Sequence, residues 1–262
     1  MPDPTVLLST DPRGIATVSL NRPELHNAFD DALIRRLIET FDALAADPKV
    51  RVVLLRGEGK SFSAGGDLNW MRRMAGYGHE ENLADARELA RLMSTWNDLP
   101  KPTVARVHGS VFAGGLGLVA GADIAIAEEA TVFCVSEARL GLVPATISPY
   151  LVAAMGARTA RRYFQTAERF SAREALRIGL VHEVVPSAGL DGAVETILAS
   201  LLEAGPSAQA RSKRLIAEVA DRPIGGALID LTVHAIAEAR ASEEAREGLA
   251  AFFEKRKPGW KR

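Results

Sequence analysis

The sequence predicts an α/β protein with a largely parallel sheet, followed by a helical C-terminal segment. Residues 50–56, 103–107 and 124–127 are short, nearly continuous apolar runs, which are typical of strands buried on both faces. Loops and helical patterns separate these runs, as expected when crossovers join parallel strands. After Gly141 the sequence changes to alanine- and arginine-rich stretches with helical signals.

The N-terminal elements are predicted to be two strands and a helix. Residues 5–10 and 15–20 are rich in β-favouring residues and flank the turn sequence 11–14, which predicts a hairpin. From Asp30 to about residue 46, apolar residues recur every three or four positions, as on the buried face of a helix. The Asp47–Pro48 pair ends that pattern.

The later part of the chain is predicted to be mostly helical. One further strand is expected at residues 180–185, and helices are expected at residues 148–166, 171–178, 188–204, 206–220 and 228–254. We divide the chain into an α/β body at residues 1–190 and a helical C-terminal segment at residues 191–262. No low-complexity linker separates the two parts, and no repeat of fixed period is found.

Composition and charge exclude several classes of protein. Apolar residues make up 47% of the 262 positions and charged residues 25%, which excludes a disordered, collagen-like or coiled-coil chain. The 32 basic and 33 acidic residues nearly cancel, so no long-range field favours nucleic acid or a membrane as partner. No apolar run reaches the ~18 residues that a membrane-spanning helix needs. The first residues lack the pattern of a signal peptide, and we expect a cytoplasmic protein.

Cysteine and histidine usage gives no sign of a metal site. Cys134 is the only cysteine, which excludes an internal disulfide and a zinc site made of thiolates. The five histidines show none of the spacings of metal ligands. We therefore expect no bound metal.

Two glycine-rich loops each follow an apolar strand and begin a helix, at residues 63–68 (SAGGDL) and 109–117 (GSVFAGGLG). Unpaired N–H groups at such a turn can bind an oxyanion. An ordinary strand-to-helix turn capped by Asp67 explains the first loop as well. The second loop lacks the glycine spacing of a dinucleotide site and the Gly-Lys-Ser/Thr of a phosphate-binding loop.

Glu137 is a candidate acid–base residue because it follows the apolar residues 133–135. A desolvated carboxylate has the raised pKa that a general acid needs. Alternatively, Glu137 pairs with Arg139 or caps a turn. The chain lacks the G-x-S-x-G sequence of an α/β-hydrolase. Its basic and aromatic end, residues 255–262, is either a phosphate contact or a solvated tail.

Taken together and in this order, the motifs resemble those of the crotonase superfamily, the enoyl-CoA hydratases and isomerases. The resemblance runs through essentially the whole chain and includes residues 21–24, 26–28, 62–68, 113–117, 133–137, 141–144 and 254–257. Residues 112–170 are similar to bacterial 3-methylglutaconyl-CoA hydratases of leucine and isoprenoid breakdown. The resemblance implies a crotonase-like spiral of ββα repeats, with C-terminal helices that pack on neighbouring subunits in a trimer or a pair of trimers.

The resemblance also implies the site. The substrate is an acyl thioester of coenzyme A, so no separate cofactor is expected. Its carbonyl oxygen would bind between the N–H groups of Gly66 and Gly114, and Glu137 would move a proton. The segment from Leu25 to Ala28 would contact the adenine, and Lys255, from this or another subunit, the phosphates. The remaining implied substrate contacts are Ala64, Asp67, Leu68 and Gly117.

One position departs from the family pattern. Hydratases of the best-known type have a first catalytic glutamate where this chain has Gly117. A hydratase that works with Glu137 alone is our first hypothesis, and an isomerase that moves the double bond between the β,γ and α,β positions is the alternative. A non-catalytic scaffold or RNA-binding member is a third, which the near-neutral charge and the retained Glu137 disfavour. A small residue at position 117 could leave room for a branched or carboxylated acyl chain.

Overall fold

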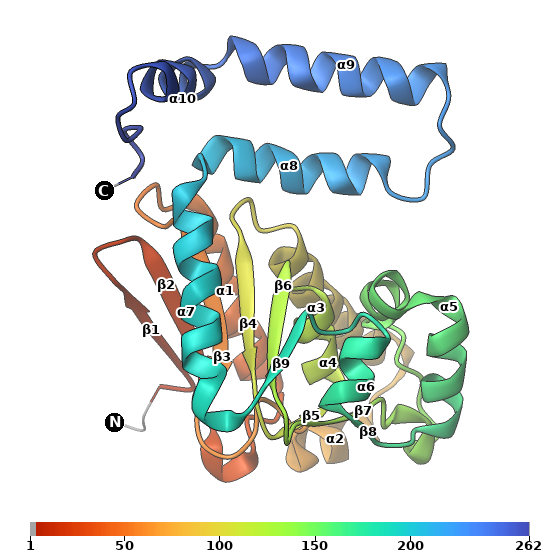
Figure 1. Ribbon diagram of the computed structural model, residues 1–262. Coiled ribbons are helices and arrows are strands. Elements are labelled where there is room, and N and C mark those ends of the chain that lie inside the picture. Colours follow the sequence, from red (N-terminus) through yellow and green to blue (C-terminus); the bar gives the residue numbers. More distant parts are fainter. Residues whose placement is uncertain (1–3, 262) are drawn as a thin grey trace.

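A six-stranded sheet forms the centre of the protein in the computed structural model, which describes residues 4–261 (Figure 1). Only the first pair of strands is antiparallel, and the other four pairings are parallel, as the sequence predicted. In spatial order the strands are β1 (Val6–Thr10), β2 (Ile15–Leu20), β3 (Val52–Gly57), β4 (Thr103–Val107), β6 (Ile124–Glu128) and β9 (Glu183–Val185).

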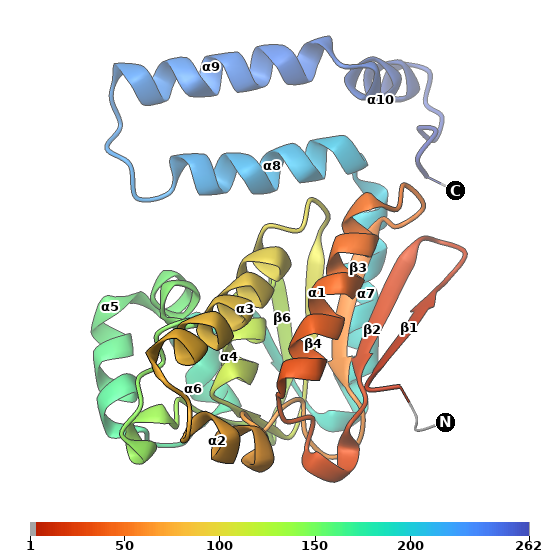
Figure 2. The same cartoon turned by 180° about the vertical axis from the view of Figure 1, so that it is seen from behind.

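Both faces of this sheet are covered by helices. In β3, Val53 and Leu55 belong to the core beneath α1 (Asp31–Ala46) and α3 (His79–Asn97), which Figure 2 shows in front of the sheet. Val52 and Leu54 belong to a second core with α7 (Leu190–Glu203) on the other face. Because alternate side chains of a strand point to opposite faces, this burial explains the continuous apolar run.

A second, three-stranded sheet lies beside the first. It consists of β5 (Ser110–Phe112), β7 (Val132–Cys134) and β8 (Phe170–Ser171). The sequence did not predict it, because strands of two or three residues are too short to show a period. The small sheet leads directly into two short helices, α4 (Gly114–Ala120) after β5 and the 3-10 helix η2 (Glu137–Leu140) after β7.

The helices of the body begin and end close to the predicted residues, with one exception. The Asp30 side chain accepts a hydrogen bond from the N–H of Leu33 (2.8 Å) and caps α1. Helix α3 was missed, because only Leu92, Met93 and Trp96 near its C-terminal end are buried. The other helical elements are η1 (Pro23–Leu25), α2 (Leu68–Met74), α5 (Ser148–Thr166), α6 (Ala172–Arg177) and η3 (Ser187–Gly189).

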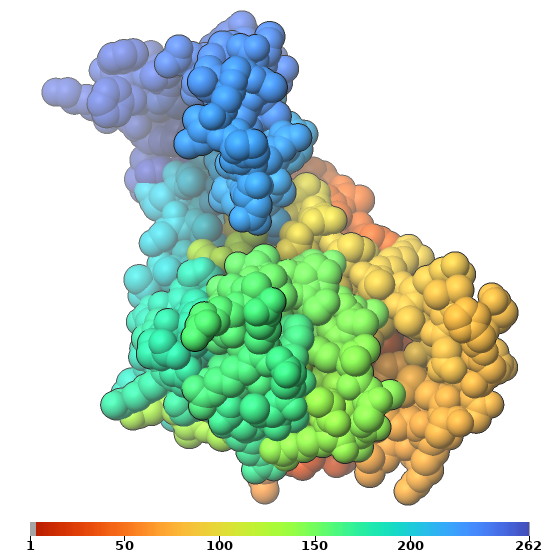
Figure 3. Space-filling view, turned by 90° about the vertical axis from the view of Figure 1, so that its right-hand side faces the viewer, coloured from red at the N-terminus to blue at the C-terminus, as the bar shows by residue number. Residues whose placement is uncertain are grey.

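Three C-terminal helices form an arm that stands away from the body (Figure 3). They are α8 (Pro206–Val219), α9 (Gly226–Ala241) and α10 (Glu243–Phe253). The single helix predicted at 228–254 is interrupted at Ser242, whose hydroxyl accepts from the N–H of Ala245 and caps α10. Since α7 packs on the sheet, the part that leaves the body begins at α8.

An ion pair joins the arm to the body, and a helix cap joins two helices within the arm. The Lys213 ammonium of α8 lies 2.9 Å from a carboxylate oxygen of Asp123, which precedes β6. The Glu244 carboxylate of α10 accepts from the N–H groups of Ser207 and Ala208 (2.9 and 2.7 Å) at the start of α8. None of the helices described for residues 4–261 is both long and apolar enough to cross a membrane.

Candidate active site

The first glycine loop is held along both edges of its backbone. On one side, the N–H of Ser63 donates to Ser110 O (3.2 Å) and Ser63 O accepts from Phe112 (2.9 Å). On the other side, Ala64 N donates to His26 O (2.9 Å). The loop therefore lies like a strand between residues 26–29 and the small sheet.

Gly66 forms an isolated parallel bridge with Phe29. Phe29 N donates to Gly65 O, and Asp67 N donates to Phe29 O, both at 2.7 Å. Since bonded groups alternate along a strand, the N–H of Gly66 points away from Phe29. It finds no main-chain acceptor among the described residues, so it is available to a ligand.

The second glycine loop turns sharply from β5 into α4. Ala113 has φ +47° and ψ −120°, a backbone conformation that costs an L-residue on the order of 1–3 kcal/mol. Its N–H donates to Cys134 O (3.0 Å), which fastens the turn to β7. Gly114 is the first residue of α4, so its N–H has no acceptor within the helix.

The two glycine loops touch at Gly65. This residue has φ +98°, and a Cβ atom there would lie 3.3 Å from Cβ of Ala113 and 3.5 Å from Phe112 O. Glycine is therefore required both by the backbone conformation and by the close approach. This contact brings the loops that carry Gly66 and Gly114 together.

Glu137 begins η2, directly after the strand β7 to which the second loop is fastened. Its Oε2 atom is buried and has no hydrogen-bond partner in the part of the chain that the structure describes. Burial raises the pKa of this carboxyl, and a hydrogen bond from its own backbone N–H offsets that only in part. Glu137 and Arg139, both in the described part of the chain, form no ion pair. The alternative in which these two residues pair is therefore excluded. A carboxyl of this kind suits proton transfer.

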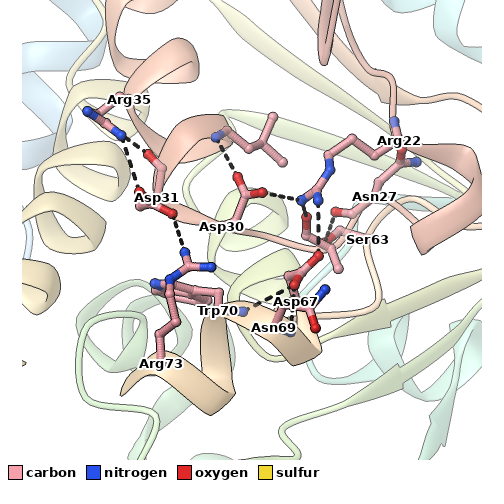
Figure 4. Close-up of polar contacts among 12 residues, drawn as sticks. Arg22, Asn27, Asp30, Asp31, Arg35, Ser63, Asp67, Asn69, Trp70 and Arg73 are labelled. Carbon is pink, nitrogen blue, oxygen red and sulfur yellow. Dashed lines mark hydrogen bonds and ion pairs between the residues drawn. The ribbon is translucent and has the colours of Figure 1, made fainter. Parts of the chain in front are cut away.

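A buried polar network supports the first loop, as Figure 4 shows. The fully buried Asn27 donates from its amide to Glu58 O and Ser61 O (2.9 and 2.8 Å) and accepts from the N–H of Arg22 (2.8 Å). The sequence predicted a role only for residues 25–28 of this segment, as an adenine contact, and used residues 21–24 and 26–28 as family motifs. The supporting roles of Arg22 and Asn27 were missed, because they depend on partners far along the chain.

Asp67 is a helix cap rather than a free ligand group. Its Oδ1 accepts from the N–H groups of Asn69 and Trp70 (2.8 and 3.2 Å), and its Oδ2 accepts from Arg22 (3.0 Å). Burial alone would raise the pKa of Asp67, but these two N–H groups and the Arg22 charge outweigh it and lower the pKa. The capping interpretation of Asp67 is confirmed, and its carboxylate is engaged within the protein.

The other implied contacts differ in exposure. Leu25 and Leu68 are exposed, at 42% and 70% of their surface, and can meet a ligand. Ala64 is half-buried, and Ala28 is buried, with only 8% of its surface exposed. Their roles as substrate contacts stay predictions.

The packing around Gly117 corrects the expectation that a small residue there leaves room for an acyl chain. It is buried in α4, and a Cβ atom there would lie 2.5 Å from Cγ2 of Ile147 and 2.7 Å from Sδ of Met93. These two side chains occupy the place that a side chain at position 117 would take. The expectation that the missing side chain leaves room for an acyl group is therefore wrong.

The chain end after α10, which includes Lys255, and the segment after β2 lie at opposite ends of the strands (Figure 1). The chain end after α10 is tied to Arg51, which precedes β3 and donates to Trp260 O (3.0 Å). Residues 25–28 instead follow the end of β2. Because β2 and β3 are parallel and have six residues each, the two ends of these strands lie ~20 Å apart. The structure does not bring Lys255 to this segment within one chain.

The packing around Gly117 gives a stability prediction. Gly117→Ala should lower the free energy of unfolding by about 1–3 kcal/mol, because the new methyl group overpacks against Ile147 and Met93. Thermal unfolding measures this. Gly192→Ala in α7 is the matched control, since a Cβ atom there meets nothing within 4 Å and should stabilise by up to ~1 kcal/mol. Stabilisation by both substitutions would contradict the packing described here.

Comparisons with known proteins match nearly the whole chain to one family. The family model for enoyl-CoA hydratase/isomerase matches residues 10–262. The chain is 32% identical over 250 residues to enoyl-CoA hydratase domain-containing protein 3, mitochondrial, of Xenopus laevis, covering 94% of this chain and 83% of that protein.

Solved structures are similar over nearly the whole chain. A crystal structure of an enoyl-CoA hydratase from Shewanella pealeana has a TM-score of 0.95 and 45% identity, covering 98% of this chain and 96% of that one. One from Mycobacterium smegmatis has a TM-score of 0.92 and 34% identity, with coverages of 98% and 99%. The chain therefore belongs to the enoyl-CoA hydratase/isomerase family, the crotonase superfamily.

Proposed function

We propose that the protein adds water across the α,β double bond of an acyl-CoA thioester, with Glu137 as its only acid–base residue. The observation that carries this proposal is the buried carboxyl oxygen of Glu137, which has no hydrogen-bond partner among residues 4–261. It lies three residues beyond Cys134, whose carbonyl holds the turn that carries Gly114. The acid and one oxyanion donor are therefore attached to neighbouring strands of one small sheet.

The proposed mechanism starts with the thioester carbonyl between the N–H groups of Gly66 and Gly114. Each such donor typically contributes ~3 kcal/mol to the transition state, because negative charge develops on the oxygen. The β-carbon becomes electrophilic and is attacked by water. Glu137 gives its proton to the α-carbon and takes one from the added water. One molecule of water is added, and Glu137 returns to its starting state.

A second candidate is isomerisation of a β,γ-unsaturated acyl-CoA. The observation that favours it is the apolar filling by Met93 and Ile147 beside Gly117, where the first catalytic glutamate of the best-known hydratases would be. Isomerisation needs one carboxylate only. Ionised Glu137 would remove a proton from the α-carbon and return it to the γ-carbon.

For the acyl group, we propose 3-methylglutaconyl-CoA as the first to test. The support is the similarity of residues 112–170 to bacterial hydratases that act on it in leucine breakdown. A turnover screen that includes 3-methylglutaconyl-CoA, crotonyl-CoA and a β,γ-unsaturated ester separates the candidates. Equal inactivity on all three would contradict both proposed reactions.

Replacement of Glu137 tests the acid–base role. Glu137→Gln should lower kcat by ~10²-fold or more and leave thioester binding nearly unchanged, because the amide keeps the shape but cannot transfer the proton. Steady-state kinetics and a binding titration measure the two effects. Glu39→Gln, at an exposed position of α1, is the control. Unchanged kcat in Glu137→Gln would refute the assignment.

The pH dependence of kcat/KM distinguishes the two reactions. Hydration uses protonated Glu137, so its rate should fall as the pH rises through the raised pKa of this carboxyl. Isomerisation uses the ionised form, so its rate should rise over the same range. The inflection should lie above the ordinary glutamate value of ~4.3 in both cases. A hydration rate that increases through this range would contradict the proposed role of the acid.

We further propose that the protein is a trimer or a pair of trimers. The arm exposes large apolar side chains, among them Ile224 at 89% and Phe252 and Phe253 at 76% each. So many exposed large apolar side chains on one arm are typical of a surface that is covered by a neighbouring subunit. In this assembly Lys255 would contact the phosphates of coenzyme A bound by a neighbouring subunit, since Lys255 and residues 25–28 of the same chain lie far apart.

Mass measurement and one substitution test the assembly. Light scattering should give three or six chains of 28.1 kDa.

Lys255→Gln should raise KM severalfold and leave kcat unchanged, because a phosphate contact far from the reacting carbons contributes uniform binding. Lys49→Gln, on the surface before β3, is a control of the same charge change. A stable monomer with full activity would overturn the proposal.

A further inference from the structure

Arg22 lies beside Asp30 and Asp67 (Figure 4), which are the chain neighbours of the bridged residues Phe29 and Gly66. Its side chain is only 12% exposed. It follows β2 in the chain, whereas Gly66 follows β3, so the arginine reaches the glycine loop from a different segment of the body.

The guanidinium binds acceptors on both sides of the bridge. Its Nη1 donates to Ala28 O (2.6 Å) and lies 3.0 Å from a carboxylate oxygen of Asp30. Its Nη2 donates to Oδ2 of Asp67 (3.0 Å). Ala28 and Asp30 flank Phe29, and Asp67 follows Gly66, so one side chain joins the neighbours of both bridging residues.

The two carboxylates that Arg22 binds are helix caps. Asp30 caps α1, and Asp67 caps α2. The guanidinium therefore fixes the starts of two helices relative to each other, and the Phe29–Gly66 bridge runs between them. Without it, two half-buried or buried carboxylates would face each other and the carbonyl of Ala28 would lose its donor, which would drive the segments apart.

We propose that Arg22 is a positioning residue that fixes the direction of the Gly66 N–H toward the thioester carbonyl. The inference rests on the proposed function, in which Gly66 is an oxyanion donor. Such a donor acts only when it is aimed at the developing charge, so a small rotation of residues 65–67 costs rate more than binding. The planar fork of arginine can bridge three acceptors, whereas a lysine ammonium offers a single point of charge.

The test combines kinetics with a spectrum that reports carbonyl polarisation. Arg22→Met removes the charge and the fork, and Arg22→Lys keeps the charge alone. We expect kcat to fall about tenfold or more in Arg22→Met, within the range of an oxyanion donor, with KM nearly unchanged and a smaller fall in Arg22→Lys. Bound cinnamoyl-CoA, whose absorption shifts to longer wavelength when its carbonyl is polarised, should lose part of that shift in the same order.

Lys213→Met is the matched control, because it also breaks a half-buried ion pair but lies at the arm. It should leave the shift and kcat unchanged even if it lowers the unfolding temperature. If the unaltered protein produces no shift with cinnamoyl-CoA, the oxyanion role itself fails. If it produces the shift and folded Arg22 variants keep both shift and kcat, the role of Arg22 is overturned. Should Arg22→Met not fold, Arg22→Lys decides.

Discussion

The backbone of residues 62–67 is hydrogen-bonded along both edges, and the geometry of the candidate site depends on this double pairing. The proposed contacts to the thioester carbonyl are main-chain N–H groups, which no side-chain rotamer can adjust. Residues 26–29 hold one edge and the small sheet holds the other. The direction of the Gly66 N–H is thereby set by pieces of chain from three regions of the sequence, and Arg22 fastens two of them.

The same constraint explains the glycines and the burial of the acid. Gly65 allows the two loops to touch, and a Cβ atom at Gly115 would lie 2.9 Å from Ser63 O. These glycines serve close approach of backbones rather than flexibility. The strand that anchors the second loop also leads to Glu137, whose burial favours the protonated carboxyl. Met93 and Ile147 fill the space beside Gly117, so the chain cannot place a second carboxylate there without repacking.

The sequence by itself determined the central architecture and the chemical groups. A strand covered on both faces is apolar at nearly every position, so the runs at 50–56 and 103–107 revealed the parallel sheet. Helix α1 was predictable because its period and its cap are local signals. The order of the glycine loops and Glu137 indicated the family, since the order of motifs can be read from the sequence without knowing how the chain folds.

Only the tertiary structure decided how those groups are arranged. Helix α3 and the three short strands have weak local signals and exist because they pack against distant segments. The network of Arg22, Asp30 and Asp67 joins positions up to 45 residues apart. Whether Gly117 leaves a space depended on Met93 and Ile147, which no local pattern connects to it. Composition and periodicity report how a residue relates to its neighbours in sequence, whereas hydrogen bonds, burial and free volume depend on which distant segments meet.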